Sequence, residues 1–485
     1  MDGLEAVELK LQQLRALDKK FRIDSYFFSK QYFVIDNLLR KYEVVNLGDI
    51  LANLTDYHAN GSYEILKNHV AISDSKDYAY MVRTSDLEAN DFVNNVKYVS
   101  EHAYNFLTKS KVYGGEILIN KIGSAGKSYL MPYLNRPVSL GMNLFLLRLN
   151  KDYESEFVYS YLQTKYGELL IKREVSGAVP LSIDKSSVRN IIIPKLSSNF
   201  QYDIKKLFSL ANQKLDQSKR LYQEAEQLLL EELGLANFKP SDENISIRKL
   251  SDSFGAFGRL DSEYYQPKYN NIAEHIKLGN HKVLSNIVHI RKSIEPGSDA
   301  YCEEGIEFIR VSNISKFGIT KSDICLPVDF LPETEYNTLK PKPGTILLSK
   351  DGSVGIAYRI KNKMECITSG ALLHLNIKDE CLDKIMPEYL TLVLNSVLVQ
   401  MQAERDAGGS IIQHWKPSEI EQILIPCLDI QHQCLIEDKI KSSFQLKEQS
   451  QQLLDLAKHA IELAIEQNET ASVNYITNHI SKEFA

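Results

Sequence analysis

Two stretches of the chain carry apolar or small residues at alternating spacings of four and three, the pattern of a helix with one buried seam. The seam positions are Ile204, Phe208, Ala211, Leu215, Ser218, Tyr222, Ala225 and Leu229 in the first stretch, and Ile436, Ile440, Ser443, Lys447, Ser450, Leu454, Ala457 and Ile461 in the second, with imperfections at Ser218, Lys447 and Ser450. The pattern predicts long helices over 201–236 and 429–469, and about 34 helical residues span roughly 50 Å. Two amphipathic helices in separate cores would show the same pattern. We favour a coiled coil of the two, because a lone helix this long finds little local core.

The remainder of the chain mixes short apolar runs with helical periodicity. Strands are predicted at 116–120, 144–149, 190–194, 306–311, 345–349, 371–377 and 422–426. Helices are predicted over 25–42, 157–174, 262–278 and 387–404. Each globular part is therefore expected to be α+β, and the polar stretch 235–246 is expected to link the first long helix to the second globular part.

The chain repeats itself with a period of about 230 residues. "RIDSYFF" at 22–28 matches "RLDSEYY" at 259–265, and "VRTSDL" at 82–87 matches "IRVSNI" at 309–314. "GEILINKIGSAG" at 115–126 matches "GTILLSKDGSVG" at 344–355, and "VRNIIIPKL" at 188–196 matches "IEQILIPCL" at 420–428. A period this long excludes a solenoid and predicts a duplicated half.

The segment "NKIGSAGKS" at 120–128 resembles the end of a phosphate-binding loop, but the repeat gives it another meaning. The loop needs a glycine where Lys121 stands. The second half carries Ile356 and Ala357 in place of Lys127 and Ser128. What both halves share is an apolar run, a lysine and Gly-Ser-x-Gly, which predicts a strand that runs into a glycine-enabled turn.

Charge is segregated along the chain, although the formal net charge is only −6. Residues 97–151 hold eight bases against two acids, a net of +6, and residues 340–363 hold six bases against one acid, a net of +5. Residues 429–469 hold eight acids and four bases, a net of −4. Two local basic regions are compatible with nucleic-acid binding, and solvated faces are the alternative interpretation.

Composition narrows the class of protein further. No apolar run approaches the roughly 18 residues of a membrane span, and the first residues show no signal peptide, so a cytoplasmic location is expected. The six cysteines form no C-x-x-C pair, and we interpret them as reduced thiols or small core residues. A metal site from Cys427, His432 and Cys434 is the alternative to plain packing.

Catalytic constellations are hard to find in the sequence. There is no H-E-x-x-H, no G-x-S-x-G and no Asn-Pro-Pro-aromatic motif. Glu116 and Lys121 would suit a metal-dependent nuclease, but the second half replaces Glu116 with Thr345, and Asp351 is matched by Ile122. Two related modules on a rigid spacer would instead suit two DNA segments about one helical turn apart.

The duplicated motifs and the helix after each resemble the specificity subunit of type I restriction–modification systems. The resemblance rests on "GTILLSKDGSVG" and its twin, on "GGSIIQHWKPSEIEQILIPCLDIQHQ" at 408–433, and on the looser "SGAVPLSIDKSSVRNIIIPKLSSNFQ" at 176–201. It implies two target-recognition domains that each read half of a split DNA site, and two spacer helices packed as an antiparallel coiled coil that set the gap. The chain itself would be non-catalytic.

The resemblance also implies an order of domains and a set of partners. The expected order is an N-terminal helical segment (1–20), a first target-recognition domain (21–200), a first spacer helix (201–236), a second target-recognition domain (237–428), a second spacer helix (429–469) and a C-terminal tail (470–485). Partners would be double-stranded DNA, two methyltransferase subunits and, through them, restriction–translocase subunits. S-adenosylmethionine, ATP and magnesium would bind those partners, which methylate adenine and cleave DNA, and this chain would bind no cofactor.

Eight basic residues are the candidates for DNA contact. Arg83 and Arg310 match across the repeat, as do Lys121 and Lys350, whereas Lys109, Lys111, Lys127 and Arg359 are specific to one half. For any one of them, an ion pair that holds the fold is the alternative. Trp415 is predicted to be core, and Gln201 and Gln433 are predicted to shape a strand-to-helix junction. Two other functions stay open: a coiled-coil scaffold without DNA binding, and a nuclease with one active half.

Overall fold

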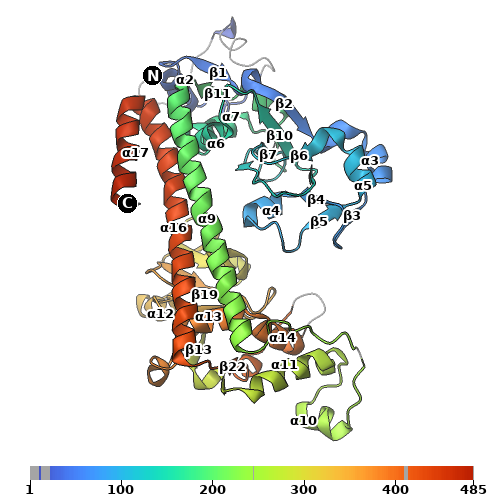
Figure 1. Cartoon of the computed structure of the whole chain (residues 1–485). Coiled ribbons are helices and arrows are strands. Elements are labelled where there is room, and N and C mark those ends of the chain that lie inside the picture. The colour runs from blue at the N-terminus through green and yellow to red at the C-terminus, as the bar shows by residue number, and fades with distance from the viewer. Residues whose placement is uncertain (1–9, 13–21, 178, 244, 409–412, 484–485) are drawn as a thin grey trace. The chain divides into compact units, whose positions relative to one another are not determined.

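The computed structural model describes residues 10–12, 22–177, 179–243, 245–408 and 413–483 (Figure 1). The chain divides into two compact units, Met1–Lys214 with Gln449–Ala485 (unit 1) and Leu215–Glu448 (unit 2). Each unit mixes helices and sheets, so the α+β prediction is confirmed. Most of the predicted helical segment 1–20 lies outside the described residues, as do positions 409–412 of the motif at 408–433.

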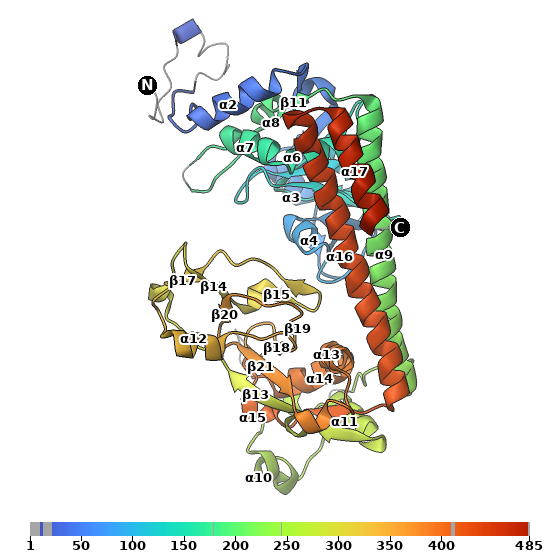
Figure 2. The ribbon, with the colours of Figure 1, turned by 90° about the vertical axis from the view of Figure 1, so that its left-hand side faces the viewer.

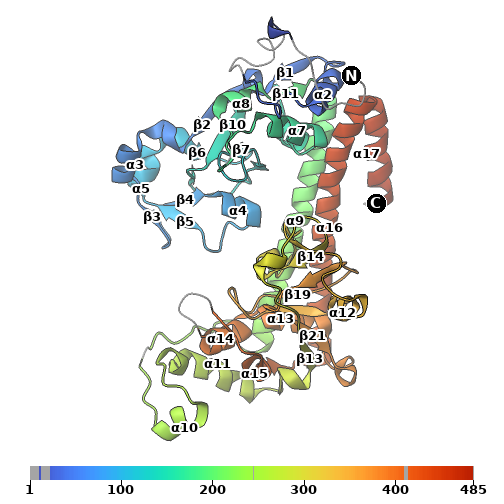
Figure 3. The same ribbon diagram turned by 180° about the vertical axis from the view of Figure 1, so that it is seen from behind.

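The described residues of unit 1 form three sheets (Figure 3). An antiparallel sheet has the order β2 (Leu51–Asp56), β10 (Leu144–Leu149), β7 (Ile117–Asn120), β8 (Ser128–Leu130). A second has the order β3 (Ile72–Ser73), β5 (Lys97–Val99), β4 (Ala79–Val82), β9 (Val138–Leu140), β6 (Lys111–Val112), with β4 and β9 parallel. β1 (Val44–Asn46) pairs with β11 (Ile192–Pro194).

Unit 2 has a corresponding set of pairings (Figure 2). Its antiparallel sheet has the order β13 (Val288–Lys292), β21 (Leu372–Ile377), β18 (Ile346–Ser349), β19 (Ala357–Arg359). A second sheet has the order β17 (Cys325–Leu326), β14 (Ile306–Ile309), β20 (Cys366–Thr368), with β14 and β20 parallel. β12 (His281–Val283) pairs with β22 (Leu424–Pro426), and β15 (Ile314–Ser315) with β16 (Gly318–Ile319).

Within each unit, the strands therefore follow one another in the same spatial order. β2, β10, β7 and β8 correspond to β13, β21, β18 and β19, and β1–β11 corresponds to β12–β22. The side chains that these sheets bury are mostly aliphatic, such as Ile117, Ile119 and Leu147 in unit 1 and Ile346, Leu348 and Leu375 in unit 2. Five of the strands predicted from apolar runs are the central strands β7, β10, β14, β18 and β21, and the predicted strands at 190–194 and 422–426 are β11 and β22 of the two-stranded pairs.

Shorter helices accompany the strands along the chain in both units. In unit 1 they are α2 (Lys30–Leu39), α3 (Tyr63–His69), α4 (Thr84–Ala89), α5 (Glu101–Phe106), α6 (Ser155–Leu162), α7 (Lys165–Glu174) and α8 (Lys185–Asn190). In unit 2 they are α10 (Phe254–Phe257), α11 (Pro267–Leu278), α12 (Glu333–Leu339), α13 (Pro387–Asn395), α14 (Val397–Asp406) and α15 (Pro417–Ile420).

The prediction of single helices over 157–174 and 387–404 is wrong, because each range contains two. In unit 1 the hydroxyl of Thr164 caps α7 by accepting the Gly167 N–H at 3.1 Å. Gly167 also permits close packing, since a Cβ there would lie 2.2 Å from the Tyr161 carbonyl oxygen. In unit 2 the break falls at Ser396, whose hydroxyl donates to the Val393 carbonyl at 2.6 Å. Both breaks are set by local polar bonds that an apolar pattern does not reveal.

The two long helices are α9 (Ser198–Glu232) and α16 (Ile430–Glu466), close to the predicted ranges. In unit 1, Leu207 and Ala211 of α9 share a core with Leu453, Ala457 and Ala460 of α16. In unit 2 the hydroxyls of Ser218 and Ser443 lie 3.1 Å apart, both buried, and Ser443 Oγ donates to the Ser218 carbonyl at 2.8 Å. The two serines, which interrupt the apolar seam, therefore satisfy each other's hydrogen-bonding groups.

The helix pairing is antiparallel within unit 2, because residue numbers rise on α9 as they fall on α16. After the Ser218–Ser443 pair, Glu224 and Lys439 form the next ion pair, at 2.6 Å. In unit 1, the C-terminal segment expected as a tail is the helix α17 (Glu469–Glu483), which lies beside α16 (Figure 1). Its Ser472 hydroxyl donates to the Ala460 carbonyl at 2.6 Å, and Ile476 joins the core.

Gln201 and Gln433 shape the strand-to-helix junctions, as predicted. Gln201 Nε2 donates to the Leu196 carbonyl, and Gln433 Nε2 donates to the Leu428 carbonyl five residues earlier, at 3.0 and 2.8 Å. Their carbonyl oxygens accept the backbone N–H groups of Glu154 and Met386. The same glutamine thus ties the same junction in each unit. Trp415 is 1% exposed and packs in the core of unit 2, so this prediction is also confirmed.

Candidate nucleic-acid interface

The Gly-Ser-x-Gly turn has the same geometry in both units. In unit 1 the Gly126 N–H donates to the Asn120 carbonyl, and the Asn120 N–H donates to the Lys127 carbonyl, both at 2.9 Å. In unit 2 the Gly355 N–H donates to the Ser349 carbonyl and the Ser349 N–H to the Ile356 carbonyl, again at 2.9 Å. The shared motif is therefore a strand-connecting turn, as the repeat predicts.

The glycines are needed for the turn for two different reasons. Gly123, Gly126, Gly352 and Gly355 all have φ between +73° and +86°, which side-chain-bearing residues rarely adopt. Gly126 and Gly355 are also crowded, since a Cβ would lie 2.2 Å from Ile171 Cγ2 in unit 1 and 2.6 Å from Gln400 Nε2 in unit 2. Gly123 has open space on its Cβ side. The turn is held against α7 or α14 and forms a fixed platform.

Arg83 lies next to this turn in unit 1, at the start of α4. Its Nη2 atom lies 2.6 Å from Asp86 Oδ1, and the Asp86 hydrogen bond raises the pKa of Arg83. Thr84 Oγ1 donates to Asn120 Oδ1 at 3.1 Å, which ties α4 to the turn. The Arg83 side chain is about one-third exposed, but its charge is compensated by Asp86.

Arg310 occupies the same place in unit 2 without the same compensation. It follows β14 as Arg83 follows β4, but Asn313 stands where Asp86 stands, and its Oδ1 accepts the Arg310 backbone N–H at 3.0 Å. Within the described ranges, the guanidinium of Arg310 has no ion pair, and its Nε is buried without a hydrogen-bond partner. The two arginines matched by sequence therefore differ in available charge.

Lys121 and Lys350 are matched by sequence, but each is neutralised by a different acid. Lys121 is 9% exposed, and its Nζ lies 3.2 Å from Asp56 Oδ2, while Lys185 lies 2.7 Å from the other oxygen. Burial alone would raise the pKa of Asp56, but the Lys185 and Lys121 contacts outweigh it and lower the pKa. Lys350 pairs with Asp351, which also accepts from His414. In both units the lysine is part of an internal ion-pair cluster.

Lys109 and Lys111 keep their charge available in unit 1. Lys109 is exposed, and its backbone N–H donates to Asn60 Oδ1 at 2.9 Å. The Lys111 ammonium lies over the Tyr104 ring at 4.3 Å. Neither ammonium has an ion pair in the part of the chain that the structure describes. They lie on and before β6, at one edge of the five-stranded sheet.

Lys127 and Arg359 are each paired across their unit. Lys127 Nζ lies 2.9 Å from Glu88 of α4, with both side chains substantially exposed. Arg359 Nη1 lies 3.0 Å from the buried carboxylate of Glu388. Much of the charge that gathers along 97–151 and 340–363 is thus compensated by acids from other segments, which the local count of charges does not reveal.

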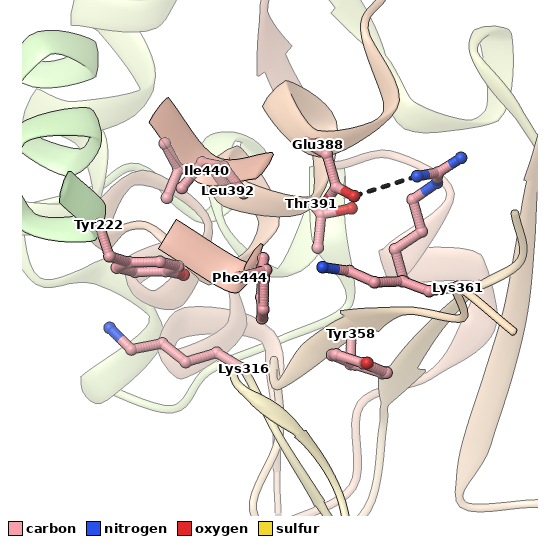
Figure 4. A pocket seen from close by; sticks show the side chains of 10 residues that line it. Tyr222, Lys316, Tyr358, Lys361, Glu388, Thr391, Leu392, Ile440 and Phe444 are labelled. Carbon is pink, nitrogen blue, oxygen red and sulfur yellow. Dashed lines mark hydrogen bonds and ion pairs between the residues drawn. The ribbon is translucent and has the colours of Figure 1, made fainter. Parts of the chain in front are cut away.

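Unit 2 has a small pocket where its sheet packs on the two long helices (Figure 4). Its lining residues are Tyr222, Lys316, Tyr358, Arg359, Lys361, Glu388, Thr391, Leu392, Ile440 and Phe444. Lys361 Nζ lies 3.4 Å from the Phe444 ring centroid, and burial lowers the pKa of this ammonium. Lys316 pairs with Glu226 at 2.8 Å and lies over Tyr222. No sequence pattern indicates this aromatic–lysine packing, because its residues come from distant segments.

The groups considered for catalysis have structural partners. Glu116 is 5% exposed, accepts the N–H groups of Tyr113 and Gly114, and pairs with Arg148 at 3.1 Å. Cys427 is buried, whereas His432 pairs with Asp429 and with Glu232. Over the described residues, no group of three or more His, Cys, Asp or Glu side chains is placed to hold a metal ion.

Comparison with known proteins gives matches among solved structures. The chain is similar to specificity subunits of type I restriction–modification systems. The S subunit from M. genitalium matches at 14% identity over 91% of this chain and 94% of that chain, with a TM-score of 0.35. The HsdS subunit from Thermoanaerobacter tengcongensis matches at 13% identity over 88% and 97%, with a TM-score of 0.28.

A further match is a chain from a structural study of complex assembly and conformational transition in the type I R-M system. It matches at 14% identity over 86% of this chain and 97% of that chain, with a TM-score of 0.29. No family model and no curated protein matches the chain. Among the described helices, none combines the length and apolar character that crossing a membrane requires.

Proposed function

We propose that this chain is the DNA-binding specificity subunit of a type I restriction–modification complex, with one recognition module in each unit reading one half of a bipartite site. The observation that carries the proposal is that the two units share one framework of strands and turn but differ in their available cationic side chains. Strand order and the hydrogen bonds of the turn are the same in both units. Among the described residues, Lys109 and Lys111 in unit 1 and Arg310 in unit 2 carry positive charge without an acidic partner.

Such a pair of modules suits a site with two different halves. Positive groups fix a protein on DNA phosphates, and side chains at base edges select sequence. A common framework would place both modules on DNA in the same way, and different side chains would select different bases. The proposal assigns DNA contact first to these three uncompensated groups. Arg83, Lys121, Lys127, Lys350 and Arg359 remain weaker candidates, because each already has an acidic partner.

The long helices complete the proposal. The seam residues that are buried in each unit support an antiparallel coiled coil of α9 and α16, which would act as the spacer between the half-sites. We infer that methyltransferase subunits dock on this chain, and restriction subunits on them, in the cytoplasm. S-adenosylmethionine, ATP and magnesium belong to those partners in this proposal, and the chain itself is not an enzyme.

Salt-dependent DNA binding tests the proposal. Each phosphate that a protein neutralises contributes about −0.9 to the slope of log affinity on log salt concentration. The chain, assembled with its methyltransferase partner, is expected to bind duplex DNA with a slope of several units below zero. The triple variant K109Q/K111Q/R310Q should flatten the slope by about 2–3 units, and K195Q, which removes the exposed lysine that pairs with Glu43, is the matched control. A flat slope for the unmodified complex would instead support a protein scaffold that does not bind DNA.

A further inference from the structure

Cys302 and Cys325 of unit 2 lie opposite each other on neighbouring extended segments. The Cys302 N–H donates to the Cys325 carbonyl, and the Cys325 N–H donates to the Cys302 carbonyl, both at 2.9 Å. An antiparallel pair that exchanges both bonds has its Cα atoms about 5.5 Å apart with both side chains on one face. That separation lies inside the range of roughly 4.4–6.8 Å that disulfide bonds span.

The surroundings of the two thiols distinguish them from the other four cysteines. Cys302 and Cys325 are both partly exposed, whereas Cys366, Cys381 and Cys427 are buried and Cys434 is exposed. Burial raises the pKa of Cys366 to about 12 and also raises the pKa of Cys427, which keeps both as unreactive thiols. No other two cysteines are bridge partners in the described chain, which includes all six.

The chain around the pair holds it in place. Cys325 begins β17, which pairs on its other side with β14. Residues 303–305 carry the chain from Cys302 around the end of β17, and Gly305 is crowded there, since a Cβ would lie 2.1 Å from the Leu326 carbonyl oxygen. The Cys302 thiol donates to the Glu304 carbonyl at 3.1 Å, a weak bond that is readily given up.

We propose that Cys302 and Cys325 form a reversible disulfide, a redox-sensitive modification site in the second module. The oxidant is a low-molecular-weight disulfide such as oxidised glutathione. One cysteine thiolate attacks a sulfur of the oxidant, which releases one glutathione thiolate and leaves a mixed disulfide on the protein. The second cysteine thiolate then attacks the protein-bound sulfur and releases the second glutathione. Two protein thiols are oxidised, one glutathione disulfide is reduced, and two protons leave the protein.

The bond would be reversible for a geometric reason. Directly opposed strand residues that exchange both hydrogen bonds hold their Cβ atoms further apart than the mean of about 3.8 Å for disulfides. The strands must therefore draw together, and strained disulfides are more easily reduced. The bond would fix β17 to the segment of Cys302, which continues through residues 303–305 into β14, the strand that leads directly into Arg310. This inference does not depend on the proposed function, because thiol chemistry is measured without DNA.

Thiol counting and peptide mapping test the proposal. The full chain, incubated with oxidised glutathione, is expected to fall from six to four titratable thiols under denaturing conditions and to yield one peptide pair linked through Cys302 and Cys325. A dithiol should restore all six. C302S is expected to carry a glutathione adduct on Cys325 instead, and C434S should still form the link. Glutathione adducts on both cysteines with no link between them, or a link that involves Cys434, would overturn the proposal.

Discussion

Replacing Asn313 by Asp would give Arg310 the acidic partner that Arg83 already has. Asp86 and Asn313 stand three residues after their arginines, and Asp86 holds the Arg83 guanidinium at 2.6 Å. Asn313 Oδ1 already accepts the Arg310 backbone N–H at 3.0 Å, so a carboxylate at position 313 would lie next to Arg310. N313D is therefore expected to compensate the charge of Arg310 with little change in the fold.

The expected size of the effect depends on what Arg310 contacts. Loss of one phosphate contact would make the slope of log affinity on log salt less negative by about 0.9. Loss of a base-edge contact would weaken binding by about 1–3 kcal/mol, roughly 5- to 150-fold. The assay is equilibrium binding of the assembled complex to duplex DNA at several salt concentrations.

A double-mutant comparison separates pairing with Arg310 from simple repulsion between the new carboxylate and DNA. R310M alone should match N313D, and N313D should add nothing in the R310M background. Unchanged affinity and slope in N313D would refute the assignment of Arg310. An equal loss in both backgrounds would show that the negative charge itself, rather than pairing with Arg310, weakens binding.

Three further predictions concern the turn, the core and the helices. G126A should destabilise unit 1 by about 1–3 kcal/mol more than G123A does, because both have a left-handed φ but only Gly126 lacks room for a Cβ, with the thermal midpoint of unfolding as the measure. His374 Nδ1 accepts a hydrogen bond from Arg291, and burial, aided by the Arg291 charge, lowers the pKa of His374 to about 4. Below pH 6.5 the unfolded chain therefore binds a proton that the folded chain does not bind. The free energy of unfolding of unit 2 should fall by about 2 kcal/mol between pH 7 and pH 5, and H374L should not show this loss. Four-residue insertions after both Lys214 and Glu448 would preserve the contacts inside each unit and lengthen each long helix by about 6 Å. The gap in the recognised site should then grow by about one or two base pairs, and both half-sites should stay unchanged.

Each of these has an outcome that would contradict it. Equal destabilisation by G123A and G126A would show that φ strain alone matters. The same acid sensitivity in H374L would place the titrating group elsewhere. A changed half-site in the insertion variant would mean that the helices do more than space the modules.

The elements predicted best from the sequence are those that depend on local periodicity. The seam of α9 and α16 and the central strands β7, β10, β18 and β21 follow directly from apolar spacing. The helix breaks at Thr164 and Ser396 were missed because apolar periodicity continues across them. The range 470–485 is predicted only as a C-terminal tail, although Val473, Ile476 and Ile480 of α17 have helical spacing.

Candidate side chains were harder to predict than elements, because their partners lie far away in sequence. The pairing of Lys121 with Asp56 spans 65 residues, and nothing in the motif around Lys121 indicates it. The contrast between Arg83 and Arg310 was visible in principle, since "VRTSDL" has Asp86 where "IRVSNI" has Asn313. The consequence of this difference becomes clear only from the structure, in which the Arg83 guanidinium pairs with the Asp86 carboxylate.

Each unit is proposed to carry one independent reader of DNA sequence, and exchanging a single module is the sharpest test of that independence. Residues 245–428 would be replaced by the corresponding module of another such chain, and the methylated sites of a host genome would be mapped with the assembled methyltransferase complex. If the two modules read DNA independently, one half of the bipartite site should change while the other half stays the same. A change in both halves, or in neither, would contradict this independence.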